Sequence, residues 1–260
     1  MIHLKTAEEI LIMRAAGRIV AAAHAEARAM VKPGVTTAQI DEVVERTIRK
    51  HGAIPTFIGY PPGSAHPFPA ATTISINHEL VHGIPSPKRV LQEGDIVSID
   101  CAATYKGFVA DGGFTMGVGK ISPEAQRLIE IGEEALRIGI QNAVLGKETR
   151  DIAIAIQTYV ERQGCSVIRE YTGHGVGRAL HEEPQVPNWW PRGRKQRSWR
   201  SYPLQVGMTF ALEPMISLGS PKTRVLDDHW TVVMADGALC TWVEHTIAVT
   251  DGEPLILTLP

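Results

Sequence analysis

Apolar residues recur at the spacing of an amphipathic α-helix in four stretches of the chain. The first two run from Thr6 to Met30 and from Thr37 to about Gly52. A third begins at Ser122-Pro123, where serine suits the N-cap and proline the first turn. A fourth covers about residues 150–162. Glycine-punctuated, strand-forming stretches follow each pair, so the pattern predicts two helix pairs alternating with β-structure.

Two parts of the chain also resemble each other. Residues 91–100 and 204–213 share the letters L-Q-x-G, several apolar residues and a closing acid, at an offset of 113. Residues 34–52 and 146–164 match at an offset of 112. The alternative is coincidence between generic helix starts and strand entries, but the matched acids favour a duplication. We therefore predict one α+β domain over residues 1–260, with related halves of about residues 1–118 and 119–260.

Composition narrows the class of protein. The chain has 260 residues, of which 44% are hydrophobic and 21% charged, and its formal net charge is −2. This near-neutral balance argues against a DNA-binding or anionic-membrane protein, and no apolar run is long enough to span a bilayer. We find no signal peptide, and three cysteines without a paired motif suit a reducing compartment. We expect a soluble, cytoplasmic, monomeric protein.

Two acids occur where a buried strand is expected. Asp100 lies within the apolar run 95–103, and Asp111 lies in the run that returns after a turn. If Tyr105 and Lys106 form the tip of the hairpin, the two carboxylates lie directly opposite each other. Like charges in that position are destabilising, and they need a shared proton or a cation between them.

Two further acids and a histidine complete a candidate metal site. Glu213 ends a second apolar run, and Glu244 lies in an alternating strand. A single acid of this kind is usually a solvent-exposed strand end, but four together favour a buried site. His174 lies between glycines, which either expose its imidazole to a ligand or merely form a turn. Four carboxylates and one histidine suit two divalent ions better than a structural zinc site.

The order of these five residues resembles the dinuclear site of the methionine aminopeptidases of bacterial type I. That family belongs to the creatinase and prolidase group, and the resemblance implies their "pita-bread" fold, in which duplicated halves surround an antiparallel sheet with pseudo-twofold symmetry. The resemblance spans the whole chain. Its motifs are Ser75–Asn77, His82–Pro85, Gly94–Asp100, Arg169–Arg178, His181–Val186, Gly207–Phe210, Leu212–Met215, Trp230–Thr231 and Glu244–Ile247.

The resemblance implies a role for each residue of the metal site. Asp111, His174 and Glu213 would bind one ion, and Asp100 would chelate the other. Glu244 and Asp111 would bridge the two ions. The family implies two divalent cations per chain, drawn from Co²⁺, Mn²⁺, Fe²⁺, Zn²⁺ and Ni²⁺.

The same resemblance implies an activity and a substrate site. The enzyme would remove the initiator methionine from nascent proteins by metal-activated attack of water, with a preference for a small second residue. Glu213 would transfer the proton, while His82 and His181 would contact the substrate amide and stabilise the tetrahedral intermediate. Three aromatic residues would line the methionine pocket, although packing in the core or a loop is the alternative for each. They are Phe57, Tyr60 and Trp230.

Two alternatives remain open at this point. A proline-directed peptidase of the same fold is one, but such relatives usually carry an additional N-terminal domain for which 260 residues leave little room. A non-catalytic member that binds peptide or RNA is the other, and it would be expected to lose metal ligands.

Two loops, residues 61–70 and 187–203, lie beside the predicted site motifs. The second loop is basic and aromatic, so it could contact ribosomal RNA, although short charge runs are more often only solvated. The side chains concerned are Trp189, Trp190, Arg192, Arg194, Lys195, Arg197, Trp199 and Arg200.

Overall fold

The computed structural model describes residues 2–193 and 198–260, and it contains the four predicted helices. These are α1 (Ala7–Met30), α2 (Thr37–Lys50), α3 (Pro123–Gln141) and α4 (Thr149–Arg162). Thr6 and Thr36 close capping boxes at the starts of α1 and α2, and Ser122 caps α3 ahead of its first-turn proline. Within the described residues, none of the helices is long and apolar enough to cross a membrane.

Strands account for most of the remaining regular structure. The large sheet has nine strands in the antiparallel order β1-β4-β5-β14-β9-β7-β8, with β2 added on β4 and β15 on β14. The strands are β1 (Ile54–Pro55), β2 (Thr72–Ile76), β3 (Glu79–Val81), β4 (Ile96–Tyr105), β5 (Phe108–Gly117), β6 (Ser166–Val167), β7 (Gly173–Gly175), β8 (Glu182–Val186), β9 (Thr209–Leu212), β10 (Met215–Ser217), β11 (Thr223–Val225), β12 (Val232–Met234), β13 (Cys240–Trp242), β14 (Glu244–Ala248) and β15 (Leu255–Ile256).

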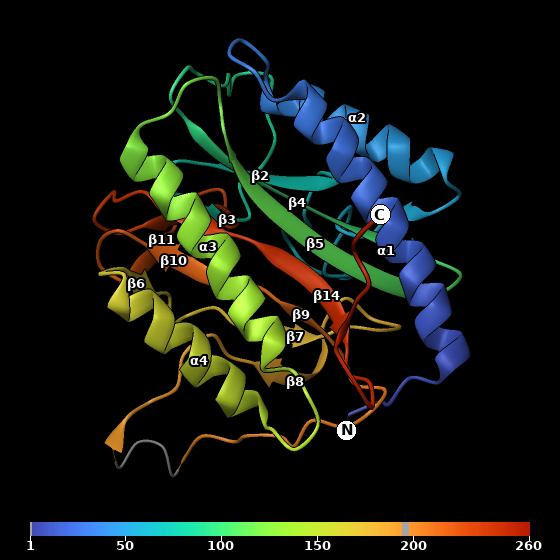
Figure 1. Cartoon of the computed structure of the whole chain (residues 1–260). Coiled ribbons are helices and arrows are strands. Elements are labelled where there is room, and N and C mark those ends of the chain that lie inside the picture. The colour runs from blue at the N-terminus through green and yellow to red at the C-terminus, as the bar shows by residue number, and fades with distance from the viewer. Residues whose placement is uncertain (1, 194–197) are drawn as a thin grey trace.

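The helices cover one side of this sheet. In Figure 1, α1 and α3 run across the front of the strands, with α2 and α4 beside them. One buried cluster joins α1 and α2 to β4 and β5, and a second joins α3 and α4 to β9 and β14. The predicted α+β class with an antiparallel sheet is confirmed.

Equivalent backbone features mark the proposed duplication. The helices α2 and α4 each have 14 residues, and each follows a glycine in the left-handed region, Gly34 (φ 87°) and Gly146 (φ 82°). β4 and β9 likewise follow Gly94 (φ 93°) and Gly207 (φ 88°). Only glycine adopts this conformation without steric cost, so these positions constrain the sequence in both halves. They support the division into residues 1–118 and 119–260, which stays a proposal.

The two faces of the central strands differ in chemistry. Val97, Ile99 and Cys101 of β4 pack under the helices, whereas Asp100 points to the opposite face. Successive side chains of a strand alternate between faces, so every second position is available for polar groups without disturbing the helix packing. The face turned away from the helices therefore carries the candidate site.

The register of the β4–β5 hairpin differs from the prediction. Tyr105 pairs with Phe108, so the turn consists of Lys106 (φ 48°) and Gly107 (φ 78°). Two residues with positive φ form the tight turn that best matches the twist of a hairpin. Asp100 therefore lies opposite Gly113 rather than Asp111, and Asp111 lies opposite Ala102. The two acids still share one face, but as diagonal neighbours, so the prediction of direct opposition was wrong.

Candidate metal centre and its cavity

A cavity of about 170 Å³ opens on the face of the sheet that the helices leave free. All ten site residues predicted from the sequence line it, together with eight others. The predicted ones are Phe57, Tyr60, His82, Asp100, Asp111, His174, His181, Glu213, Trp230 and Glu244. Residues far apart in the chain meet here because β4, β5, β14, β9 and β7 are consecutive neighbours in the sheet.

A single glycine makes room at the floor of the site. A Cβ atom on Gly113 would lie 1.9 Å from the indole ring of Trp242, so no larger residue fits there. The indole Nε1 donates a hydrogen bond of 3.3 Å to Oε2 of Glu213. Gly113 also pairs with Glu244 across β5 and β14. The missing side chain thus lets the Trp242 ring occupy this position and hydrogen-bond one of the acids.

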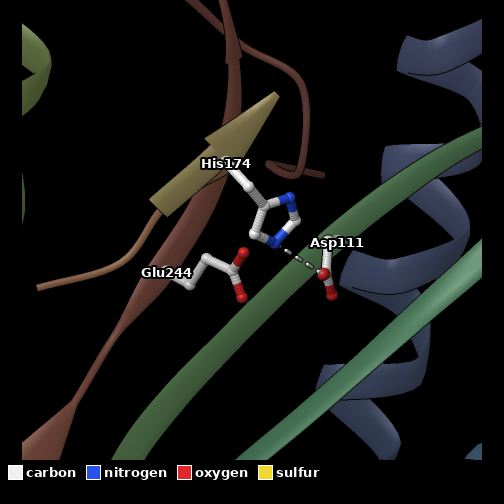
Figure 2. A group of neighbouring side chains, drawn as sticks. All are labelled: Asp111, His174 and Glu244. Atoms are coloured by element: carbon white, nitrogen blue, oxygen red, sulfur yellow. Dashed lines mark ion pairs between the residues drawn. The ribbon is translucent and has the colours of Figure 1, made fainter. Parts of the chain in front are cut away.

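His174 faces the carboxylates with its unprotonated nitrogen. Its Nδ1 lies 3.0 Å from the carbonyl oxygen of Gly175, which makes Nδ1 the protonated nitrogen. Its Nε2 lies 3.5 Å from Oε1 of Glu213 and 3.9 Å from Oδ2 of Asp111. Figure 2 shows His174, Asp111 and Glu244 converging, and their candidate ligand atoms all lie within 4.8 Å of one another. This spacing suits a cation between them.

The acids are buried without compensating positive charge. Among the described residues, Oδ1 of Asp100, Oδ1 of Asp111 and Oε1 of Glu244 are buried and accept no hydrogen bond. Burial raises the pKa of Asp100, Glu213 and Glu244, the neighbouring carboxylates raise it further, and burial raises the pKa of Asp111 to about 7. Unpartnered carboxylate oxygens at such short spacing are what divalent cations bind, so this donor set fits a metal centre.

Two more histidines stand beside the acids. The ring of His181 lies 4.1 Å from that of His174, and its Nδ1 lies 2.5 Å from the hydroxyl of Tyr60. His82 adopts a left-handed backbone conformation (φ 60°), which is uncommon outside glycine and marks functional positions. Burial lowers the pKa of His82 to about 4, of His174 to about 3, and also that of His181. All three imidazoles are therefore neutral at pH 7.

Aromatic side chains wall the remaining side of the cavity. Phe68 lies between Phe57 and Trp230, with ring-centroid distances of 6.3 and 5.1 Å. Phe57 lines the cavity and also belongs to a buried apolar cluster. Its position is therefore compatible both with the predicted pocket role and with the alternative of core packing. Phe68 belongs to the 61–70 loop and was not predicted, because the proline-rich loop carries no periodic signal.

Other cavity residues were also missed. Tyr171 lies three residues before His174, and Trp242 lies two residues before Glu244 on the same strand face, so proximity in sequence was an available signal. Leu180 and Met215 read as ordinary core residues. These two residues line the cavity only because the folded chain brings them there, so no local sequence pattern identifies them.

The 187–203 loop is partly built into the protein. Trp190 is only 5% exposed, and Trp199 packs edge-on against it at 5.5 Å. Arg192 forms an ion pair of 2.7 Å with Glu161. A buried indole is not available for stacking on bases, which weakens that part of the RNA hypothesis. Three of the predicted basic residues, Arg194, Lys195 and Arg197, lie outside the described residues.

Comparison with known proteins gives consistent matches. The sequence matches metallopeptidase family M24 over residues 12–251. It is 47% identical over 258 residues to methionine aminopeptidase 1 of Bacillus subtilis, covering 99% of each chain. The solved methionine aminopeptidase of Thermotoga maritima superposes with a TM-score of 0.93 at 39% identity and full coverage of both chains. A prolidase from Pyrococcus furiosus shares the fold at 22% identity (TM-score 0.77), with 99% of this chain matched to 65% of that one.

Proposed function

The chain belongs to metallopeptidase family M24, and we propose that it is an aminopeptidase that removes the N-terminal methionine of nascent proteins. The observation that carries this proposal is the set of buried, unpartnered carboxylates beside an aromatic pocket. The identity to methionine aminopeptidases over the full chain supports the substrate. The prolidase likeness, at 22% identity, shows the fold alone, so the proline-directed alternative has no comparable support.

The side chains suggest how two divalent cations would be held. Asp111, His174 and Glu213 would hold one, Asp100 would hold the other, and Asp111 and Glu244 would bridge them. When bound, such cations lower the pKa of water and polarise the peptide carbonyl. The oxygen-rich set is consistent with Co²⁺, Mn²⁺, Fe²⁺, Zn²⁺ or Ni²⁺.

Glu213 would carry the proton. One of its oxygens faces His174 and the other accepts the hydrogen bond of Trp242, so the carboxylate is held in a fixed orientation. Burial, and then the charge of Asp111, raises the pKa of this carboxyl group above its ordinary value, and a positioned carboxylate is a common general base and acid. Glu213 would take a proton from the attacking water and deliver it to the leaving amine.

His82 and His181 would act on the substrate amide. The Tyr60 hydroxyl contacts Nδ1 of His181, which leaves Nε2 of that ring to face the substrate. Neutral imidazoles can donate one hydrogen bond to a developing oxyanion or to the scissile nitrogen without adding a charge.

The pocket suits one unbranched apolar side chain. Its walls are Phe57, Tyr60, Phe68 and Trp230, and methionine sulfur packs well against aromatic rings. A cavity of about 170 Å³ is small for a ligand site, which favours a small residue after the methionine.

Chelation tests the proposal. Hydrolysis of Met-Ala-Ser is measured before and after exhaustive treatment with EDTA, and again after addition of Mn²⁺ or Co²⁺. We expect loss and recovery of activity, with little turnover of a matched X-Pro peptide. Activity that survives chelation would contradict a metal mechanism, and faster cleavage of the X-Pro peptide would favour the proline-directed alternative. No cleavage of either peptide with metal restored would favour the non-catalytic one. The monomeric state, the cytoplasmic location and ribosome contact stay predictions.

A further inference from the structure

A second hollow adjoins the catalytic cavity. It has a volume of about 520 Å³, and Tyr171 and Thr172 line both it and the cavity. A substrate whose first residue occupies the cavity must leave it as an extended chain, because only the N-terminal residue is cleaved. Because Tyr171 and Thr172 belong to both hollows, the groove lies next to the point at which that chain would leave the cavity.

The floor of the groove is pre-organised and aromatic. Trp199 is 38% exposed and packs edge-on against Trp189 at 4.7 Å and against the buried Trp190 at 5.5 Å. The guanidinium of Arg200 lies 4.9 Å from the ring centre of Tyr202. Aromatic faces that are already held in place bind an apolar side chain with little loss of side-chain entropy.

The edge of the large sheet also contributes to the lining of the groove. β8 is the last strand in the sheet order, and the exposed side chains of Glu183 and Gln185 line the groove. Edge strands are common docking sites for extended peptides, whose alternate side chains enter neighbouring pockets.

The charges of the groove favour a peptide over a nucleic acid. Among the described residues that line the groove, Arg169 and Arg200 are balanced by Glu170 and Glu183. This balance offers a polyanion no net electrostatic attraction, whereas binding of a largely uncharged peptide does not depend on one. The Glu170 carboxylate already accepts hydrogen bonds from Thr223, which fixes it in place.

The geometry points to a binding site for the part of the substrate that follows its second residue, with a preference for an apolar side chain on Trp199. This inference rests on the proposed aminopeptidase function. It assigns to the described part of the 187–203 loop a role in selecting among nascent chains that share the same first residues.

The test compares three peptides that begin with Met-Ala-Ser. One is the tripeptide, one continues with four glycines, and one continues with four residues that include leucine and phenylalanine. For the unmodified enzyme we expect kcat/KM to be about tenfold higher for the apolar heptapeptide than for the glycine one.

Variants then locate the effect. Trp199→Ala should lower kcat/KM for the apolar heptapeptide five- to tenfold, mainly through KM, and leave the tripeptide within twofold. Trp199→Phe should retain most of the preference. Ile154→Ala removes an equally exposed apolar side chain on α4, outside the groove, and should change nothing. Thermal unfolding of each variant verifies that the tryptophan cluster remains folded.

Each outcome decides between distinct conclusions. Equal kinetics for both heptapeptides, or equal losses on all three substrates, would overturn the groove assignment while the aminopeptidase function stands. If Trp199→Ala leaves the peptide kinetics unchanged but weakens co-sedimentation with ribosomes, the groove binds RNA and not the peptide. Failure of the metal-loaded enzyme to cleave even the tripeptide would overturn the proposed function, and the groove assignment with it.

Discussion

The two faces of the large sheet bury side chains of opposite character, apolar on one face and acidic on the other. Towards the helices, β14 presents Ile247, which is fully buried among apolar side chains. Towards the cavity, the same strand presents Glu244, which is 2% exposed and holds an unpartnered oxygen. Burial of apolar side chains on the first face stabilises the folded protein, whereas burial of charged carboxylates on the second face destabilises it.

This difference shows how the fold divides its tasks. The helix face stabilises the sheet whether or not ligands are present. The cavity face holds acids whose pKa is raised by desolvation and then by mutual repulsion, an arrangement that is unfavourable until a cation binds there. Mutations on the two faces should therefore affect different measurements, and the predictions below are designed to test that separation.

Removing one charge from the cavity face should give the largest effect. Glu244→Gln keeps the shape of the side chain but removes a ligand, so we expect kcat/KM for Met-Ala-Ser to fall by about 10³-fold or more. The metal-free variant should unfold at the same or a higher urea concentration, because one buried like charge is gone. Isothermal titration with Mn²⁺ measures the lost affinity. Retained activity would contradict the assignment of Glu244, and a large loss of stability would show a structural role instead.

The matched change on the other face should do the reverse. Ile247→Ala leaves a cavity in the apolar cluster and should lower the free energy of unfolding by about 2–5 kcal/mol. Its side chain points away from the metal centre, so kcat/KM at saturating metal should stay within about threefold. Urea unfolding and tripeptide kinetics on the same preparation measure both quantities. A catalytic loss comparable to that of Glu244→Gln would mean that the two faces are not separable.

Much of this arrangement could be predicted from the sequence. The helices followed from their periodicity and their caps, and Thr6 and Ser122 begin them as expected. The acids stood out because each lies in or at the end of an expected strand, and a buried acid is costly unless something binds it. Period-two alternation around Glu244 also placed that acid on one face of its strand.

The remainder depended on geometry that local patterns do not encode. The hairpin register changed by two residues because Lys106 and Gly107 form the turn, and a one-residue difference in where a tight turn is centred moves every pair. Phe68 reaches the pocket from an irregular loop, and Gly113 is required only because Trp242 lies across it. Such contacts join residues whose positions in the sequence follow no periodic pattern.

A histidine on the helix face allows the comparison to be extended to pH. His24 of α1 packs against Phe114 and over Gly112, its Nε2 is buried without a partner, and desolvation lowers its pKa to about 3, helped by Arg28. The unfolded chain binds a proton below pH 6.5 and the folded one does not, so stability is lost as pH falls from 6.5 towards 3.

The size of this effect follows from the shift. Between pH 7 and pH 5, His24 should remove about 2 kcal/mol of stability. His24→Phe should abolish that component, so the difference in unfolding free energy between the two proteins should change by this amount, while groups common to both cancel. The carboxylates across the sheet have the opposite sign, since burial raises their pKa. A constant difference between pH 7 and pH 5 would show that His24 is solvated in the folded protein.

Among the changes on the cavity face, the smaller loss of activity is expected at Thr246, which positions the backbone of a candidate ligand but is not a ligand itself. The Thr246 hydroxyl accepts a hydrogen bond of 2.9 Å from the backbone N–H of Asp111 and donates one of 2.7 Å to its carbonyl oxygen. Thr246→Val leaves both groups buried and unpaired, which should cost about 2 kcal/mol of unfolding free energy, about 1 kcal/mol for each group. Thr246→Ser keeps the hydroxyl and serves as the control. Because Thr246 fixes the backbone of Asp111 and not its carboxylate, kcat/KM should fall by less than about tenfold, far less than for Glu244→Gln. A larger catalytic loss at unchanged stability would place Thr246 among the residues that tune the metal centre.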